Sequence, residues 1–448
     1  MITREYFQKI CETLFSERPA REHLTMELTA EASQFCRINA AKIRQLGTVA
    51  DALYAVQLTQ EGTSAGQHRQ GTASFTLTGE IESDLVQARA VTARLRSEVA
   101  QLPPDPFCEV PKNHGHSNST RTGHLLRPDE AAEALVKPAQ GVDLAGIYAA
   151  GAVIRANANS TGQFHWFSTD NFVFDYSIYT ANQKALKGSF AGQHWDSDTY
   201  ALEMRNAAER SHALAQAPKK LSPGAYRTYL APACFSELLP MFSWGCIGEA
   251  SLRQGDSPLL QVRQGRQQFS PKFTLSEDFR GGEVPRFNDK GEVAPEYLAL
   301  IAEGELKNTL VSSRTALEYG LTGNGAGTSE GLRAPAVAGG SLPEGDAVRA
   351  LGTGLYLSNL HYLNWSDRLH GRITGMTRYA CFWVENGKLQ SPIENLRFDD
   401  SIFSLFGTAL EDLTRECTPL TSTDTYGFRS LGVANAPGVL LKQMTFTL

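Results

Sequence analysis

The spacing of apolar residues changes from a helical period to strict alternation within the first part of the chain. Residues 3–14 carry apolar side chains at helical spacing, with Thr3 as the expected N-cap of a helix. From residue 23 to residue 31 apolar and polar residues alternate without a break, which predicts a strand with one buried face. Further strand-like runs lie at residues 34–39, 42–46, 52–58 and 74–77. Together these runs predict an antiparallel meander.

A long helix is predicted next, followed by a loop and a second group of strands. Residues 80–102 place apolar side chains on one stripe, and Pro103-Pro104 ends the pattern. Residues 111–127 are polar and offer almost nothing to bury, so we expect a mobile loop. Apolar segments at 146–156, 164–167 and 172–179 predict a second meander, and residues 198–215 predict a helix.

Residues 219–224 break these patterns in the way that a domain boundary does. Beyond them, residues 225–230 predict a short strand, and residues 234–249 predict a helix kinked or broken at Pro240. We therefore expect an α+β fold with two domains. Residues 1–221 form an N-terminal α/β domain with an antiparallel-rich sheet and a long helix, and residues 222–448 form a strand-rich, barrel-like C-terminal domain.

The clearest local prediction is a hairpin at residues 379–393. Asn386-Gly387 separates two strand-like runs and supplies the two positive-φ residues of a type I′ turn. The run 382–384 is apolar throughout, which is typical of a strand buried on both faces. We therefore expect Trp383 to belong to the core.

Composition argues against two classes of partner. The 42 Lys+Arg and 48 Asp+Glu give a formal net charge of -6, so the overall charge favours neither nucleic acid nor an anionic membrane. No stretch approaches the roughly 18–20 apolar residues of a membrane span, and the start shows no signal-peptide pattern, which predicts a cytoplasmic protein. The 7 cysteines are scattered without a C-x-x-C pair, so we expect buried thiols rather than disulfides or a zinc ribbon.

One stretch matches a hydrolase motif by its letters. Residues 327–331 read G-x-S-x-G, which would make Ser329 the nucleophile of an elbow. An elbow needs a buried strand before it and a helix after it, and the glycine-rich flanks predict neither. A flexible loop is the preferred interpretation, and a stand-alone peptidase or amide hydrolase is the alternative.

A metal site in the polar loop is a second candidate. Its ligands would be Cys108, His114, His116 and His124. Structural zinc sites usually show tighter, paired spacing, so a solvated loop is preferred and a metal role is left open. His361 and His370 are interpreted as surface or hydrogen-bonded histidines. The sequence contains no His-Glu dipeptide and therefore no zincin helix motif.

Four segments resemble the TldD/PmbA peptidase family. Residues 221–239 resemble the strand with a G-x-Y…P pattern that leads into the central helix, residues 35–45 the early R-x-N…Q strand pair, and residues 143–151 the G-x-Y-x-x-G strand. Residues 375–387 resemble the hairpin typical of TldE (PmbA-like) members, which is the most specific match. The chain is therefore similar to the TldE side of this family over most of its length.

The resemblance implies a subunit without metal. In TldD-type members the central helix carries H-E-x-x-x-H, which holds zinc, and a C-terminal C-G-K supplies a cysteine. Here the equivalent turn, residues 239–246, has no histidine or glutamate, and Cys417 does not stand in a C-G-K sequence. The resemblance thus implies no catalytic residue and no metal ligand in this chain, with zinc in a TldD-like partner.

The resemblance also implies a division of labour within a cytoplasmic heterodimer that degrades unfolded peptides or matures precursor peptides. This chain would shape a peptide channel and present strand edges to an extended substrate. Whether it is an enzyme by itself is left open. The alternative is a metal-independent peptide-binding or scaffold protein that forms a homodimer.

Overall fold

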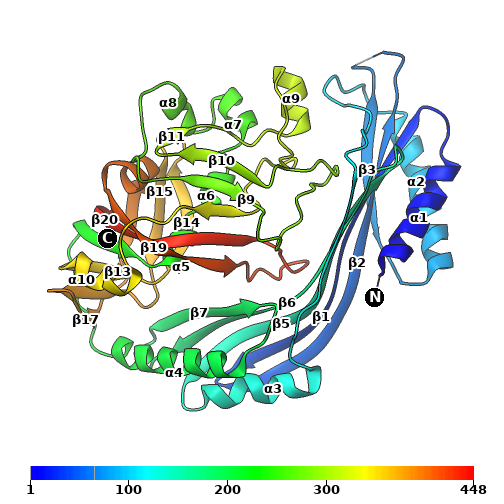
Figure 1. The fold of residues 1–448 in the computed structure, drawn as a ribbon. Helices are drawn as coiled ribbons and strands as arrows, with labels where there is room; N and C mark the ends of the chain where they lie inside the picture. Colours follow the sequence, from blue (N-terminus) through cyan, green and yellow to red (C-terminus); the bar gives the residue numbers. More distant parts are fainter. Residues whose placement is uncertain (1, 65, 448) are drawn as a thin grey trace.

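Two sheets of unequal size build the protein (Figure 1). The computed structural model describes residues 2–64 and 66–447. A 7-stranded N-terminal sheet is long and curved, and it partly encloses a second, 13-stranded sheet. The first sheet is mostly antiparallel and the second is mixed, so the expected α+β class is confirmed. The barrel-like description and the domain boundary at residues 221 and 222 stay predictions.

The N-terminal sheet has the order β3-β2-β1-β5-β6-β4, and β7 also pairs with β6. Its strands are β1 (Glu22–Asn39), β2 (Lys42–Gln60), β3 (Arg69–Thr76), β4 (His116–Arg121), β5 (Asp143–Asn159), β6 (Phe164–Tyr179) and β7 (Ala185–Gly192). Neighbouring strands are antiparallel except β4 and β6, which run parallel. Because β1 pairs with β5, the two predicted meanders form one sheet.

Several strands are longer than the sequence predicts. The runs 23–31 and 34–39 are one strand, β1, and β6 continues through residues 169–171, where polar residues suggest a turn. The predicted loop at 111–127 is wrong in part, because it contains β4. In each place, pairing with a long neighbouring strand outweighs the local polar composition.

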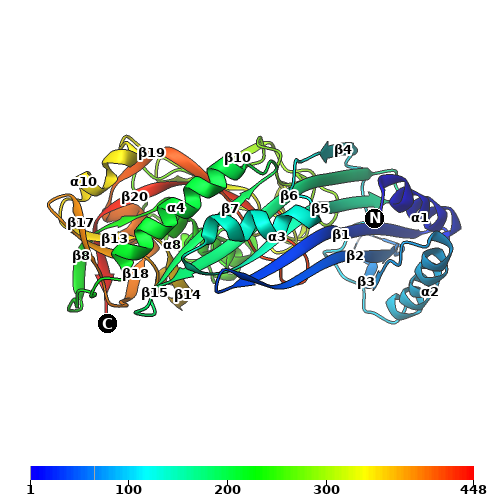
Figure 2. The same ribbon diagram turned by 90° about the horizontal axis from the view of Figure 1, so that it is seen from below.

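Helices cover the convex face of this sheet, as Figures 1 and 2 show. They are α1 (Arg4–Glu17), α2 (Ile81–Val99), α3 (Pro128–Val136) and α4 (Ser197–Leu214). Thr3 caps α1 as predicted, because its hydroxyl oxygen accepts from the Tyr6 backbone N–H at 3.2 Å. The alternating apolar residues of β1, such as Leu24 and Met26, are fully buried among residues of α1 and α2. The polar face of β1 is therefore the concave one.

Strand β20 lies at the centre of the C-terminal sheet. It spans Val433–Phe446 and pairs with β8 (Gly224–Leu230), β12 (Pro335–Val337), β18 (Arg397–Ser401) and β19 (Leu410–Thr421). The other strands are β9 (Leu275–Asp278), β10 (Tyr297–Ala302), β11 (Glu305–Leu306), β13 (Gly354–Leu357), β14 (Leu360–Asp367), β15 (Arg372–Thr377), β16 (Phe382–Glu385) and β17 (Lys388–Pro392). The pairs β8–β13 and β12–β20 are parallel, which makes the sheet mixed.

The predicted helix at 234–249 is broken into short pieces. Helix α5 (Pro232–Ser236) is followed by α6 (Pro240–Ser243), and α7 (Glu249–Gln254) begins only at the end of the predicted range. Pro240 starts α6 because its ring cannot continue a preceding helix. Further short helices are α8 (Leu259–Arg263), α9 (Ser313–Tyr319) and α10 (Ala347–Leu351).

The hairpin of β16 and β17 is confirmed. Asn386 has φ 51° and Gly387 has φ 72°, as a type I′ turn requires. The expectation that Trp383 is buried on both faces is wrong, because the side chain is half-buried and the ammonium of Lys219 lies 4.1 Å from its ring centroid. Within the described residues, no helix is both long and apolar enough to cross a membrane.

Candidate functional site

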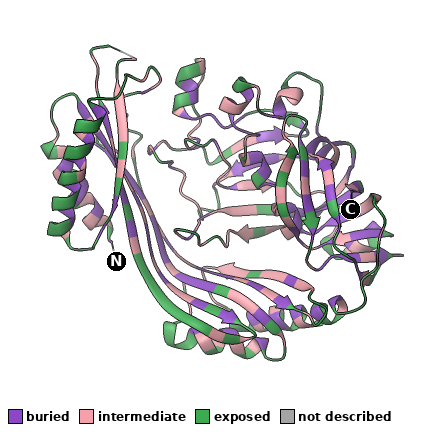
Figure 3. Ribbon diagram, turned by 180° about the vertical axis from the view of Figure 1, so that it is seen from behind, coloured by how far each residue is buried: buried purple, intermediate pink, exposed green. Residues whose placement is uncertain are grey.

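The concave face of the N-terminal sheet is polar and yet buried. Its buried polar residues include Thr25, Glu31, Ser33, Asn157, Asn159, His165 and Thr169. They alternate along β1, β5 and β6 with residues that pack against the helices. Burial of polar groups is costly unless they have partners, and loops of the C-terminal domain cover this face and supply several (Figure 3).

At one end of this face, aromatic stacking and amide hydrogen bonds join the domains. The imidazole of His165 stacks on Phe287, with ring centroids 5.2 Å apart. The Asn157 side-chain amide donates to the Asp289 carbonyl at 2.7 Å. Burial lowers the pKa of His165 to about 4, so this ring is neutral at pH 7. These contacts fix one C-terminal loop against the sheet.

Farther along, Arg429 crosses from the C-terminal domain into the N-terminal sheet. It lies in the loop between β19 and β20, and only 2% of it is exposed. It donates to the Ser33 hydroxyl at 3.2 Å, to the Gly151 carbonyl at 3.2 Å and to the Asn171 carbonyl at 2.9 Å. Burial lowers the pKa of Arg429 to about 10, and Glu31 opposes that shift. The guanidinium therefore stays charged at neutral pH and fastens this loop to the sheet.

Two adjoining cavities lie beside these interdomain contacts. One of about 400 Å³ is bounded by β6 and β7, by the turn between α5 and α6, and by the ends of β19 and β20. The other, of about 340 Å³, is bounded by β1, β5 and the loop that carries Phe287. Leu332, Arg333 and Gly432 line both cavities, so the two are adjacent, and we call them together the crevice. Clefts between domains are common places for ligand binding.

Four charged side chains line the larger cavity, namely Arg333 and a cluster of Asp175, Lys187 and Glu237. Asp175 comes from β6, Lys187 from β7, and Glu237 follows α5 directly. The Lys187 ammonium lies 3.4 Å from Glu237 Oε1, which also accepts from the Asn359 amide at 3.3 Å. Glu237 Oε2 accepts from the Leu360 backbone N–H at 2.5 Å. Both domains therefore contribute to this cluster.

Burial dominates the protonation of the cluster. It raises the pKa of Glu237, and attraction to Lys187 offsets only part of that rise. Burial also raises the pKa of Asp175. For Lys187 burial acts in the opposite direction, but Glu237 and Asp175 together outweigh it and raise the pKa of the ammonium. The Lys187 ammonium is thus a shared charge partner of two desolvated carboxyl groups, those of Asp175 and Glu237. Shifted pKa values of this kind are enriched at functional sites.

The smaller cavity contains another perturbed carboxyl group. Burial raises the pKa of Glu27 to about 7, with a further contribution from Asp289 and an opposing one from Arg155. Glu27 therefore changes charge near neutral pH. The crevice as a whole presents carboxyl groups whose ionisation a bound ligand can alter.

Strand β7 borders the larger cavity with a free edge. One edge of β7 pairs with β6, and the other pairs with no strand in residues 2–64 or 66–447. Gly188 and Ser189 of this strand line the cavity. A free strand edge beside a cavity is the arrangement that accepts an extended peptide backbone.

The residues around the turn between α5 and α6 do not fit a zinc site. In the part of the chain that the structure describes, no group of three or more His, Cys, Asp or Glu residues is placed to hold a metal ion. Cys234 and Cys246 flank the turn, and burial raises the pKa of both thiols. A zinc ligand must be a thiolate, which these surroundings disfavour.

The residues of the predicted metal loop are spread over different places. Cys108 and His114 line a separate cavity of about 1090 Å³. His116 begins β4, whereas His124 lies beside His194, with ring centroids 5.2 Å apart. The four candidates are thus not gathered at one place, and the metal role stays the alternative that the sequence does not favour.

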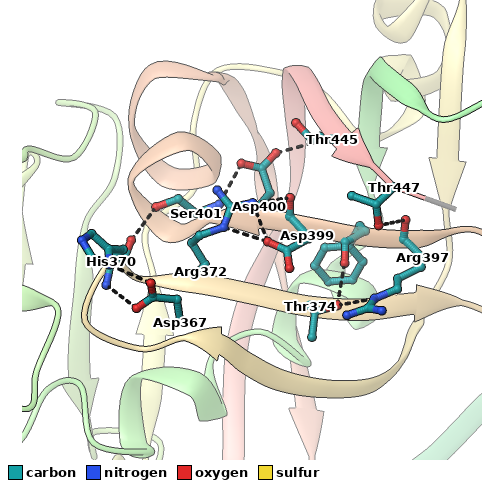
Figure 4. Close-up of polar contacts among 11 residues, drawn as sticks. Asp367, His370, Arg372, Thr374, Arg397, Asp399, Asp400, Ser401, Thr445 and Thr447 are labelled. Carbon is teal, nitrogen blue, oxygen red and sulfur yellow. Dashed lines mark hydrogen bonds and ion pairs between the residues drawn. The ribbon is translucent and has the colours of Figure 1, made fainter.

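His361 and His370 have hydrogen-bonding partners. The Nε2 of His361 accepts from the Arg378 guanidinium at 2.9 Å, and the Nδ1 of His370 lies 2.7 Å from an Asp367 carboxylate oxygen. His370 adjoins a polar network on β15 and β18, in which Arg372 pairs with a neighbouring aspartate (Figure 4). Exposed networks of cross-strand pairs are common on the outer faces of sheets.

Ser329 is exposed and lies in a turn with no helix directly after it. The following residue, Glu330, has φ 50° and is buried. Its carboxylate accepts from the backbone N–H of Ser312 and of Ala250, both at 2.8 Å. The glutamate therefore explains the conformation of this loop, because it fastens the loop to the core.

The fold and the crevice define an α+β protein with cavities between its N-terminal and C-terminal parts. The family model for the PmbA/TldA metallopeptidase C-terminal domain matches residues 223–448. The chain belongs to this metallopeptidase family, which is the TldD/PmbA family that the sequence motifs resemble. The membership confirms the resemblance.

Two known proteins illustrate the similarity. The metalloprotease PmbA of Escherichia coli O157:H7 is 26% identical over 364 residues, which are 74% of this chain and 75% of that protein. The crystal structure of TldE from Thermococcus kodakarensis superposes with a TM-score of 0.76 at 13% identity, over 99% of this chain and 100% of that one. The structural match shows that the fold is shared.

Sequence reasoning missed the residues of the crevice. A signal existed for Asp175, which interrupts the apolar run of β6. Glu237 lies two positions before the segment compared with the zinc helix, but its role depends on Lys187, which is 50 positions away. Arg429 and Ser33 are 396 positions apart in the sequence, so no local sequence pattern predicts their contact.

Proposed function

We propose that this chain is a PmbA/TldE-like, non-catalytic subunit of a cytoplasmic zinc metallopeptidase complex that degrades peptides or matures precursor peptides. Its partner is a TldD-like chain that carries the zinc and the catalytic residues. This chain holds an extended peptide in the crevice between its two domains. The role of the partner rests on family membership.

The observation that carries the proposal is the free edge of β7 beside an incompletely compensated charged cluster. The edge offers backbone hydrogen bonds to a peptide of any sequence. Lys187 donates to peptide carbonyl or carboxylate groups, and Asp175 and Glu237 accept from amides or amines.

A binding experiment tests the role of the crevice. A fluorescently labelled unfolded peptide is titrated with the wild-type chain and with a Lys187→Met, Glu237→Gln double variant. The double variant removes both charges of the pair, so the fold is less disturbed than by removal of one partner. We expect binding to weaken about tenfold or more, the effect of losing roughly 1.4 kcal/mol.

Arg372→Met is the matched control, because it removes a charge from the outer face of β15. It should bind peptide like the wild type. Equal weakening by both variants would show a general charge effect, and no weakening by the double variant would remove the crevice from the proposal.

Copurification with the partner tests whether the zinc is bound by the partner and not by this chain. We expect about one tightly bound zinc per complex and none on this chain alone. Stoichiometric zinc on the isolated chain would contradict the proposal. Peptide binding without any partner from the same host would favour the alternative, a metal-independent binding or scaffold protein.

A further inference from the structure

Asp175 is the member of the charged cluster that lacks a direct partner. Within residues 2–64 and 66–447, its carboxylate accepts no hydrogen bond and forms no ion pair, since Lys187 pairs with Glu237 instead. Glu237 also accepts from the Asn359 amide and from the Leu360 backbone N–H, so both of its oxygens are occupied. Asp175 is half-buried and lines the larger cavity. Its carboxylate is therefore the one that a ligand in this cavity can pair with.

The cluster also lacks one positive charge. When both carboxyl groups are ionised, Asp175 and Glu237 outnumber the single ammonium of Lys187. Arg333, the other cation that lines the cavity, donates to three backbone carbonyl groups. Glu277 supplies a buried carboxylate beside it, which accepts from the Arg333 backbone N–H at 2.8 Å. A desolvated carboxylate without a counterion is costly, so the cluster favours a bound cation over a bound anion.

The backbone of β7, which lies below α5 in Figure 1, shows where a peptide residue can pair. In the turn between β6 and β7, the Lys184 carbonyl accepts from the Thr180 backbone N–H at 2.9 Å, and the two strands then pair without a bulge. Alternation along the chain directs the N–H and C=O groups of Gly188 toward β6, and those of Lys187 and Ser189 toward the free edge. A peptide strand can therefore pair with this edge without breaking any bond between β6 and β7.

A peptide residue opposite Ser189 has its side chain on the same face of the sheet as Asp175. Asp175 and Ser189 lie opposite each other in the register of β6 and β7, and both line the larger cavity. The Cα spacings of the two kinds of antiparallel pair, about 5.5 Å and about 4.5 Å, place the peptide residue roughly 10 Å from Asp175. Only a long side chain spans that distance. Ser189, which lies between the two, is small and exposed.

We propose that the crevice selects peptides with a lysine or arginine side chain opposite Ser189, and that Asp175 recognises this cation. The side chain crosses Ser189 inside the cavity, and its ammonium or guanidinium group pairs with the Asp175 carboxylate. This inference rests on the proposed function, because it assumes that a peptide pairs with the free edge of β7. The amino terminus of a peptide carries the same charge, but a terminus that stays paired with β7 lies too far from Asp175.

Matched peptides test the selection. Labelled peptides that are N-acetylated, C-amidated and otherwise uncharged carry lysine, norleucine or glutamate at one central position, and each is titrated with the full wild-type chain. Norleucine has nearly the shape of lysine without the charge, so the lysine peptide should bind about tenfold or more tightly than the norleucine peptide, and the glutamate peptide most weakly. Equal binding of all three would overturn this inference and leave the proposed function standing, whereas no binding of any would contradict both.

An additional norleucine peptide with a free amino terminus distinguishes the two sources of positive charge. It should bind like the acetylated norleucine peptide. Binding as tight as that of the acetylated lysine peptide would assign the cation to the terminus and overturn the proposed side-chain recognition.

Two variants of the chain test the role of Asp175. Asp175→Asn keeps the shape and removes the charge, so the lysine peptide should bind about tenfold more weakly, while the norleucine peptide binds as before. Asp143→Asn is the matched control, because Asp143 is an exposed aspartate of the same sheet that lines none of the cavities described above. Ser189→Lys supplies a cation beside Asp175 from the chain itself and should also abolish the preference for lysine. A preference that survives both Asp175→Asn and Ser189→Lys would refute the assignment.

Discussion

Glu249 and Glu237 are two glutamates of the C-terminal domain with different surroundings, because Glu249 is buried whereas Glu237 is half-buried. Glu249 begins α7 and is 3% exposed. Its carboxylate accepts from Arg253 at 2.7 Å, from Arg263 at 2.6 Å and from the Thr309 hydroxyl at 2.7 Å. Among the described residues Glu237 has one cationic partner, Lys187 at 3.4 Å, and it lines a cavity.

The pKa values of the two carboxyl groups move in opposite directions. Burial alone would raise the pKa of Glu249, but hydrogen bonds from Arg263, Thr309 and Arg253 lower it to about 2. At Glu237 burial dominates, and the pKa rises above its ordinary value. A fully compensated carboxylate stabilises the fold, whereas an under-compensated one beside a cavity leaves interactions for a ligand to complete.

The largest expected effect is the loss of stability in Glu249→Gln. The lowered pKa of Glu249 corresponds to roughly 3 kcal/mol of unfolding free energy at neutral pH. Urea denaturation at pH 7 measures it. Glu305→Gln, which removes an exposed carboxylate of the same domain, should change stability by less than about 0.5 kcal/mol.

The same carboxylate predicts a pH dependence. Because the pKa of Glu249 in the folded state lies below the ordinary value of 4.5, its stabilisation is present above pH 4.5 and disappears as pH falls toward about 2. The difference in stability between wild type and Glu249→Gln should shrink over that interval. A constant difference from pH 7 to about pH 2 would show that the charge is not the cause.

Arg429→Ala should have the next largest effect, about 2 kcal/mol. Arg429 is as buried as Glu249, but its described partners are a hydroxyl, an amide side chain and carbonyls, not a close carboxylate. It therefore tests how far neutral hydrogen-bond partners, with the more distant carboxylate of Glu31, can compensate a buried charge. Urea denaturation measures the loss, and limited proteolysis of residues 422–431 should show that the loop has been released from the sheet. Unchanged proteolysis would mean that other contacts hold the loop.

The sequence predicts the helices and strands better than it predicts the candidate site. Helices and strands depend on residues that are neighbours in the sequence, whereas the site depends on residues that are far apart in it. Alternation along β1 and the Asn386-Gly387 turn are local patterns, and the structure reproduces both. The two predicted meanders form one sheet because β1 pairs with β5, and no local sequence pattern predicts that pairing. The crevice depends on approaches such as that of Lys187 to Glu237, which form only when the two domains meet.

Trp383→Ala should cost between about 1 and 2 kcal/mol, less than the roughly 3–5 kcal/mol of a fully buried ring. Trp383 is half-buried, and its indole N–H is buried with no partner among the described residues. Trp383→Phe keeps most of the packing and removes that N–H, so its thermal melt should match or exceed that of the wild type. Neither variant should change peptide binding, because Trp383 does not line the crevice. Loss of binding at wild-type stability would place this ring in the substrate channel.

The smallest expected change in stability is that of Glu237→Gln. Because the pKa of Glu237 is raised above 4.5 in the folded state, folding favours its protonated form, and this stabilisation is complete below about pH 4.5. It is lost as the pH rises through the folded-state pKa. At pH 7 burial opposes the charged form of Glu237 while Lys187 favours it, and Lys187 keeps Asp175 as a charge partner when Glu237 is replaced. A neutral amide of the same shape should therefore change the unfolding free energy by less than about 0.5 kcal/mol in urea denaturation. The same variant should weaken peptide binding, because it removes the charge that holds Lys187 in the cavity.

Glu249→Gln should show the reverse pattern, with lower stability and unchanged binding below its unfolding transition. If Glu237→Gln instead destabilises the protein as much as Glu249→Gln and binds peptide normally, then both glutamates are structural, and the contrast between them carries no functional meaning.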